Sequence, residues 1–186
     1  MTTTVSTPTQ ALPTGRWQLD PTHSSASFAM KHMAVATFRG RFEDFDARLD
    51  VADDGNARFT GDVRADSVVV KDENLQAHLR SPEFFDTERY PQIRFESTGI
   101  RREGDELVVD GELTIKDHTR PVEARGEITG PAITLGDVEK IGVTLEAIAD
   151  RTEFGLDWNA PLPRGGVALA NDVKLVVELE LVREAD

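Results

Sequence analysis

Apolar and polar residues alternate along most of the chain after residue 15, with the period of two that is typical of β-strands. In the segment 25–32, SASFAMKH, the side chains of Ala26, Phe28, Met30 and His32 fall on one face. The same period recurs, and the segments that show it are 42–51, 57–70, 91–98, 107–117, 139–150 and 171–182. The pattern predicts about eight amphipathic strands. Such strands cover their apolar faces in a sandwich or a closed barrel, and the pattern does not choose between them.

The segment 71–91 departs from this period because it is rich in helix-forming residues. Leu75, His78 and Leu79 recur at i, i+3 and i+4, which predicts a short helical stripe. Ser81 and Pro82 then favour the start of a second helical turn, as N-cap and first helical residue. We therefore expect one mainly β domain with a short helical insertion.

Charge and composition narrow the classes of function. The 186 residues include 34 acidic and 21 basic side chains, and the net charge is −13. A field of this sign repels phosphate backbones and anionic lipids, which disfavours nucleic acids and electrostatic membrane docking as partners. The chain has no cysteine, so disulfides and thiol chemistry are excluded. No apolar run approaches the roughly 18 residues needed for an integral membrane segment.

The first fourteen residues, MTTTVSTPTQALPT, contain neither a basic residue nor an apolar core of the kind found in secretory signals. They are rich in Thr, Ser and Pro, which favours a disordered tail. We expect the ordered domain to span residues 15–186 and the protein to stay in the cytoplasm.

Four motifs in order carry a resemblance to a known family. The stretch LDPTHSSASFAMKHMAVATFRGRF places its matching residues in the pattern D-P-x-H-S-x-x-x-F-x-x-x-H followed by G-x-F. Three further matching stretches follow at 78–98, 111–123 and 151–159. The chain resembles the YceI-like family over nearly everything from Arg16 onward. It departs from the family pattern at Asp117-His118, where members often have a turn containing glycine.

The resemblance implies an all-β fold, an eight-stranded antiparallel lipocalin-like barrel. It also implies binding of a long isoprenoid chain, of polyprenyl or quinone type, in an elongated cavity. A barrel of eight strands either fills itself with side chains or holds one slender ligand. Small inward residues such as Gly111, Ala147 and Ala149 favour a cavity, since they leave volume unfilled. The candidate ligand-binding residues are Phe28, Met30, His32, Ile93, Phe95, Leu113, Ile115, Val143, Leu145, Arg151, Leu175 and Val177.

Polar residues offer weaker signals of chemistry. The four histidines show neither a His-x-His nor a His-Glu-x-x-His spacing, so we expect no metal. His23 follows a turn and is expected to tie it down, whereas His32 either makes a polar contact at a cavity end or sits in the core. Ser24 and Ser25 lack a Gly-x-Ser-x-Gly elbow. Arg151 either closes the structure on a carboxylate or carbonyl, or holds an anionic head group with its guanidinium fork.

Three hypotheses of function remain. The first is non-catalytic binding, storage or transport of an apolar isoprenoid-type ligand, with no cofactor other than a bound isoprenoid lipid or quinone. The second is an enzyme that acts on such a substrate, for which His32 is the candidate acid or base. The third is a filled barrel that serves as a structural or interaction domain. The sequence leaves open whether the chain forms a homodimer.

Overall fold

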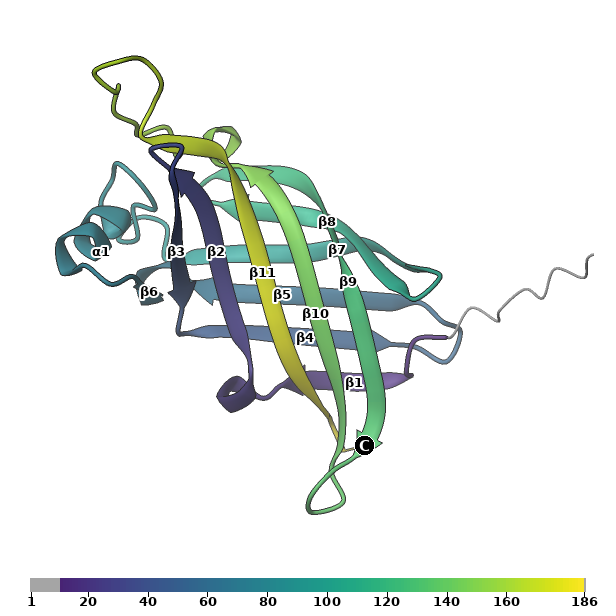
Figure 1. Cartoon of the computed structure of the whole chain (residues 1–186). Helices are drawn as coiled ribbons and strands as arrows, with labels where there is room; N and C mark the ends of the chain where they lie inside the picture. Colours follow the sequence, from purple (N-terminus) through teal and green to yellow (C-terminus); the bar gives the residue numbers. More distant parts are fainter. Residues whose placement is uncertain (1–10, 186) are drawn as a thin grey trace, which may run out of the picture.

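The computed structural model describes residues 11–185, which form a strongly twisted barrel of strands with a short helix beside one end (Figure 1). Three single helical turns, η1 (Pro21–His23), η2 (Ala65–Ser67) and η3 (Arg151–Phe154), interrupt the strands. The other elements are β1 (Gly15–Leu19), β2 (Ser25–His32), β3 (Ala36–Phe42), β4 (Phe45–Val51), β5 (Ala57–Arg64), β6 (Val68–Val69), α1 (Glu73–Arg80), β7 (Gln92–Glu103), β8 (Glu106–Ile115), β9 (His118–Ile133), β10 (Glu139–Asp150) and β11 (Leu169–Arg183).

The barrel closes through eight antiparallel strands in the order β1-β4-β5-β7-β8-β9-β10-β11, because β11 also pairs with β1. The closing register places Trp17 opposite Arg183 and Leu19 opposite Leu181. The earlier part of β11 pairs with β2 instead, with Met30 opposite Val173, and β3 and β6 continue that side of the sheet. The all-β fold with a closed eight-stranded antiparallel barrel and a short helix confirms the predicted fold class.

Local sequence explains how one stretch of chain forms both β1 and β2. Between the two strands, Asp20 accepts a hydrogen bond from the backbone N–H of Thr22 at 3.0 Å, and Pro21 fixes the first residue of η1. The turn interrupts the strand, so that β1 and β2 pair with successive parts of β11. Beyond it, Ala26, Phe28 and Met30 are buried in alternation, as the period of two predicts.

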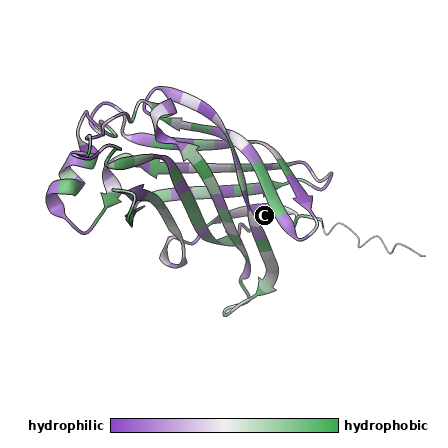
Figure 2. Cartoon of the chain, turned by 45° about the horizontal axis from the view of Figure 1, so that its top comes forward, coloured by the Kyte–Doolittle hydropathy of each residue, from purple (hydrophilic) through white to green (hydrophobic). Residues whose placement is uncertain are grey.

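Buried apolar side chains form two clusters inside the barrel. The β1 cluster fills the end near β1, and Trp17 and Leu181 in it are fully buried. The α1 cluster lies toward α1 and includes Phe28, Phe84 and Phe154. Burying each such side chain is worth about 1.5–3 kcal/mol, so each cluster contributes substantially to stability. Figure 2 shows hydrophobic and hydrophilic residues alternating along the strands that enclose these clusters.

The first described residues pack on the barrel. Leu12 packs against the β1 cluster, and Pro13 accepts a hydrogen bond from the indole N–H of Trp17 at 3.1 Å. Leu12 and Pro13 therefore contact the barrel, although the composition of the first fourteen residues favours a disordered tail. The few apolar residues among Thr, Ser and Pro carry no periodic signal, which is why the predicted boundary lies at Gly15. The rest of the expected tail lies outside the described residues.

The helical insertion is confirmed for its first part. Asp72 caps α1 by accepting from the backbone N–H of Leu75 at 2.8 Å, and Leu79 of the predicted stripe is 4% exposed. The second helical turn expected after Ser81 is wrong, because Ser81 ends α1 and the chain continues through a series of turns. The Ser81 hydroxyl donates to the carbonyl of His78 at 2.7 Å, which closes α1, and its oxygen accepts from the backbone N–H of Glu83 at 3.3 Å. Ser81 therefore makes the predicted capping contact, but to a turn rather than to a second helix.

Candidate functional site

A cavity of about 210 Å³ lies inside the barrel, between the two clusters. Its lining is almost entirely apolar and comes from strands around the whole barrel. One end is closed by the packed β1 cluster. The other end is covered by side chains from outside the barrel strands, which we call the cover, and these are Leu79, Phe84, Phe85, Phe154 and Leu156.

Ten of the twelve candidate residues line this cavity, namely Phe28, Met30, Ile93, Phe95, Leu113, Ile115, Leu145, Arg151, Leu175 and Val177. The other two lie elsewhere. Val143 is 2% exposed within the β1 cluster, where it faces the same small gap as Leu12. His32 is half-buried at the end of β2, opposite Leu169 and Ala36, and it does not line the cavity.

Sequence reasoning did not identify the cover or several aromatic residues of the lining. Phe42, Phe45 and Phe59 also line the cavity, and the period of two contained a signal for Phe45 and Phe59. The pair Phe84-Phe85 lies in a stretch of turns with neither helical nor strand period, so nothing in the pattern marked these rings as inward.

Aromatic contacts hold the cover to the barrel. The ring of Phe85 meets that of Phe42 edge to face at 5.7 Å, and Phe42 in turn lies 5.7 Å from Phe28. On the other side, His78 stacks edge to face on Phe84 at 4.9 Å and on Trp158 at 5.0 Å. Phe84 and Phe85 are therefore held by a few ring contacts rather than by strand hydrogen bonds, which favours opening on their side of the cover.

Two glycines in the strands make room for lining rings. A Cβ on Gly111 would lie 2.3 Å from Cζ of Phe95, and one on Gly40 would lie 2.4 Å from Cζ of Phe28. The interpretation of Gly111 as a source of empty volume is therefore wrong, since the Phe95 ring occupies that space. Gly61 differs, because the nearest atoms to an added Cβ, the backbone oxygen of Asp46 and Cβ of Phe95, are 3.8 and 4.0 Å away. Ala147 and Ala149 line the cavity as expected.

Arg151 is the buried charge of the lining, with 3% of its surface exposed. Its Nε donates to the carbonyl of Ala170 at 2.9 Å, and its Nη1 donates to the carbonyls of Leu156 and Trp158. These bonds fasten η3 and the following segment to the start of β11, the structural closure that was one of the two predicted roles. Among residues 11–185, the buried Nη2 has no hydrogen-bond acceptor. Burial lowers the pKa of Arg151 from its usual value.

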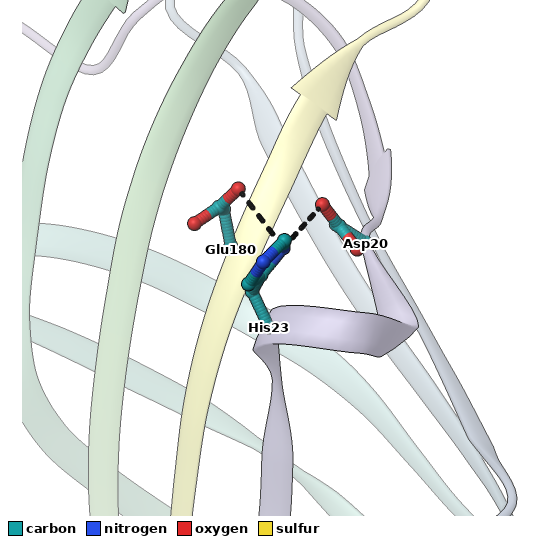
Figure 3. Close-up of side chains that lie close together, drawn as sticks. All are labelled: Asp20, His23 and Glu180. Carbon is teal, nitrogen blue, oxygen red and sulfur yellow. Dashed lines mark hydrogen bonds and ion pairs between the residues drawn. The ribbon is translucent and has the colours of Figure 1, made fainter. Parts of the chain in front are cut away.

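A second polar group lies outside the cavity, at the turn between β1 and β2 (Figure 3). His23 Nδ1 lies 2.9 Å from Asp20 Oδ2 and 3.7 Å from Glu180 Oε1 on β11. These three side chains offer donor atoms within 4.8 Å of one another, the spacing of a metal site. Lys140 occupies that space, however, with its ammonium 3.2 Å from Asp20 Oδ2 and in contact with Glu180. We interpret the group as an ion-pair network that ties the turn to β10 and β11.

The network gives the turn a measurable pH dependence. The hydrogen bond from His23, with further bonds from Lys140 and the N–H of Thr22, lowers the pKa of Asp20 to about 2. A carboxyl group with a depressed pKa in the folded state stabilises the fold above its ordinary pKa, and this stabilisation is lost as the pH falls toward the depressed value. Asp20→Asn is expected to destabilise the protein at pH 7, and the difference from wild type should shrink between pH 3.8 and about 2.

Urea unfolding across this pH range measures the difference. Asp53→Asn, which removes one exposed carboxylate from the turn before β5, controls for the change in net charge. A constant difference between wild type and Asp20→Asn down to the lowest pH at which both fold would contradict the assignment.

A closed antiparallel barrel with an apolar cavity inside it defines a lipocalin-like class of protein. The YceI-like domain family matches residues 17–181, and the chain belongs to that family. The UPF0312 protein SA2479 of Staphylococcus aureus (strain N315) is 32% identical over 164 residues, which is 87% of this chain and 94% of the relative. The predicted family is therefore confirmed.

Solved structures share the fold. Burkholderia cenocepacia BcnA superposes with a TM-score of 0.72 at 19% identity, over 87% of this chain and 98% of that chain. The Campylobacter jejuni YCEI protein gives 0.72 at 23% identity, over 83% and 90%. A polyisoprenoid binding domain from Saccharophagus degradans, implicated in plant cell wall breakdown, gives 0.62 at 12% identity, over 90% and 98%. Among residues 11–185, no helix is long and apolar enough to span a membrane.

Proposed function

We propose that the protein binds one apolar chain of isoprenoid type inside the barrel, and stores or transports it without converting it. The observation that carries this proposal is the cavity of about 210 Å³ with its almost entirely apolar lining. Membership of the YceI-like family and the likeness to a domain described as polyisoprenoid binding support the choice of ligand class. Quinones and polyprenyl lipids are the two ligand types that we retain.

The size of the cavity limits what it holds in the observed conformation. A cavity of about 150 Å³ in a protein core accepts benzene, so 210 Å³ accommodates on the order of ten carbon atoms, about two isoprenoid units. Burying ten such groups yields at most about 8 kcal/mol before ordering costs, so micromolar is the upper limit of the affinity that this space supports. A longer chain therefore requires the cover to move, and the ring contacts of Phe42 and Phe85 would be broken first.

Arg151 gives the ligand an orientation in this proposal. Its Nη2 finds no acceptor in the described part of the chain, and a carbonyl or hydroxyl oxygen on the ligand would supply one. The head group would then lie near η3, and the tail would extend toward the β1 cluster. His32, the candidate acid or base of the enzymatic alternative, does not line the cavity. No other observation favours this alternative.

A matched pair of glycine substitutions tests the proposal. Gly61→Leu places a side chain in the open space beside Ala47 and Phe95, so it should fill the cavity and abolish the ligand load while stability changes little. Gly99→Leu makes the same change opposite Asp110, at a position that does not line the cavity, and should keep the load. Extraction and mass spectrometry of lipid from each purified protein measure the load.

Two results would contradict the proposal. The first is a wild-type protein that carries no lipid and takes up none from added polyprenols or quinones. The second is an equal load in the Gly61→Leu and Gly99→Leu variants, which would place the ligand elsewhere.

A further inference from the structure

Two segments without acidic residues lie together at the covered end of the barrel. The chain has 34 acidic residues, yet none falls in 21–42 or in 158–171. The fold joins these segments, because His32 pairs with Leu169 and the backbone N–H of Met33 donates to the carbonyl of Ala168 at 2.7 Å. Figure 1 shows the β2–β3 hairpin and the loop before β11 projecting side by side. We call residues 31–39 and 161–168 the tip surface.

Apolar side chains stand exposed on the tip surface. Val35 is 86% exposed, Val167 is 52% exposed and Met33 is 42% exposed. The hairpin turn projects them outward, since Met33 and Ala34 both adopt positive φ in a tight turn between β2 and β3. Exposed aliphatic residues on neighbouring loops are the kind of group that enters the boundary between lipid head groups and acyl chains.

Cations without acidic partners surround these apolar residues. Lys31 and Arg39 are exposed on the outer face of the β2–β3 hairpin, and Arg164 is exposed on the adjacent loop. Within residues 11–185, none of the three forms an ion pair, and the ammonium of Lys31 reaches only the hydroxyl of Thr37 at 3.4 Å. Elsewhere on the barrel most arginines are paired, as Arg58 is with Glu96. The tip surface is therefore locally basic on an acidic protein.

The tip surface adjoins the α1 cluster, at the covered end of the cavity. Ala168 and Leu169, at its inner edge, are buried in the α1 cluster, and Met30, two residues before His32, lines the cavity. An apolar ligand of the proposed class dissolves poorly in water and resides in membranes, so loading requires contact with a bilayer. A surface that touched the bilayer at this end would place the cover, which is the end we expect to open, next to the lipid.

We propose that the tip surface docks on anionic lipid bilayers and that the ligand is exchanged there. The charge of −13 opposes approach at long range, which is why the sequence disfavoured electrostatic docking. At physiological salt, however, exposed charges more than about 8 Å away are largely screened. At contact, the three unpaired cations and the aliphatic side chains of the tip surface make the free energy of interaction with an anionic bilayer favourable. The docking itself does not depend on the proposed function; only the exchange of ligand at the bilayer rests on it.

Co-sedimentation with vesicles tests docking. Wild type should bind phosphatidylcholine vesicles that contain about 30% phosphatidylglycerol more tightly than pure phosphatidylcholine vesicles, and salt should weaken that binding. Val35→Asp should bind at least about tenfold more weakly, because a carboxylate would enter the interface. Leu135→Asp is the matched control, since Leu135 is 97% exposed on the β9–β10 hairpin at the other end, and it should bind as wild type does.

A second pair separates local from overall charge. Lys31→Gln with Arg39→Gln should remove most of the preference for anionic vesicles. Arg58→Gln with Arg94→Gln changes the net charge equally on another part of the barrel and should preserve the preference. The proposal would be overturned if a tip-surface variant and its matched control lost vesicle binding equally. It would also be overturned if the wild-type protein bound no vesicles or bound both kinds equally.

The two proposals fail separately. Gly61→Leu fills the cavity and leaves the tip surface intact, so it should still bind anionic vesicles. Lipid found in the wild-type cavity without vesicle binding would refute docking alone. Vesicle binding by a protein that never carries lipid would support docking and refute the proposed ligand function.

Discussion

Replacing Phe95 with arginine is expected to give a folded but weakened protein that carries no lipid. Phe95 is partly buried, lines the cavity and lies 6.1 Å from the ring of Phe59, with Gly111 beneath it. An unpaired guanidinium in this position must be solvated by water that enters the cavity, which excludes an apolar chain from the same space. The lost ring packing should lower the free energy of unfolding by about 3 kcal/mol.

The matched control is the same substitution one residue further along β7. Glu96 points outward, is largely exposed and pairs with Arg58, so Glu96→Arg should change stability by less than about 1 kcal/mol and leave the lipid load intact. Thermal melts and lipid extraction on both variants make the comparison. A Phe95→Arg protein with the wild-type lipid load would remove Phe95 from the binding site. Unfolding of that variant, together with an empty wild-type protein, would favour a barrel without a ligand.

The period of two predicted which face of a strand is inward, because burial on one side selects alternate apolar residues. The period of two does not predict burial where strands extend beyond the barrel core. β9 runs to Ile133 and its last residues are exposed on both faces, so apolar and polar residues do not alternate there. β3 begins at the tip surface with exposed residues and gave no clear period either. Closure was also beyond the local pattern, since Trp17 pairs with Arg183 from the other end of the chain.

The site was predictable in part for the same reason. A period of two assigns a face but not a depth along the barrel, and depth depends on the stagger between strands. Leu145 and Val143 share the inward face of β10 and both pack in the β1 cluster, yet Leu145 also lines the cavity and Val143 does not. His32 continues the face of Met30 but falls at the end of β2, beyond the cavity. The cover was missed because Phe84 and Phe85 belong to turns, whose conformations carry no period.

Replacing Arg151 with methionine is expected to destabilise the protein by about 3 to 5 kcal/mol. Methionine fills similar volume, but the carbonyls of Leu156, Trp158 and Ala170 lose their donor, and buried acceptors without partners are costly. Arg151→Lys keeps the charge but lacks the planar guanidinium that donates to all three carbonyls. The stability of this variant should therefore lie between those of Arg151→Met and wild type. Arg120→Met is the control, because within residues 11–185 Arg120 donates only to the exposed carbonyl of Thr119.

The same variants distinguish the two roles of Arg151. The affinities are measured at a temperature where Arg151→Met is folded. If the guanidinium only closes the structure, the ratio of the affinities for a quinone and for a plain isoprenoid hydrocarbon should be the same in Arg151→Met and in wild type. If the free Nη2 also receives the head group, wild type should prefer the quinone, and the variant should lose that preference. Equal affinity of wild type for both ligands would leave Arg151 with the structural role alone, because a donor that recognises an oxygen must distinguish a ligand that lacks one.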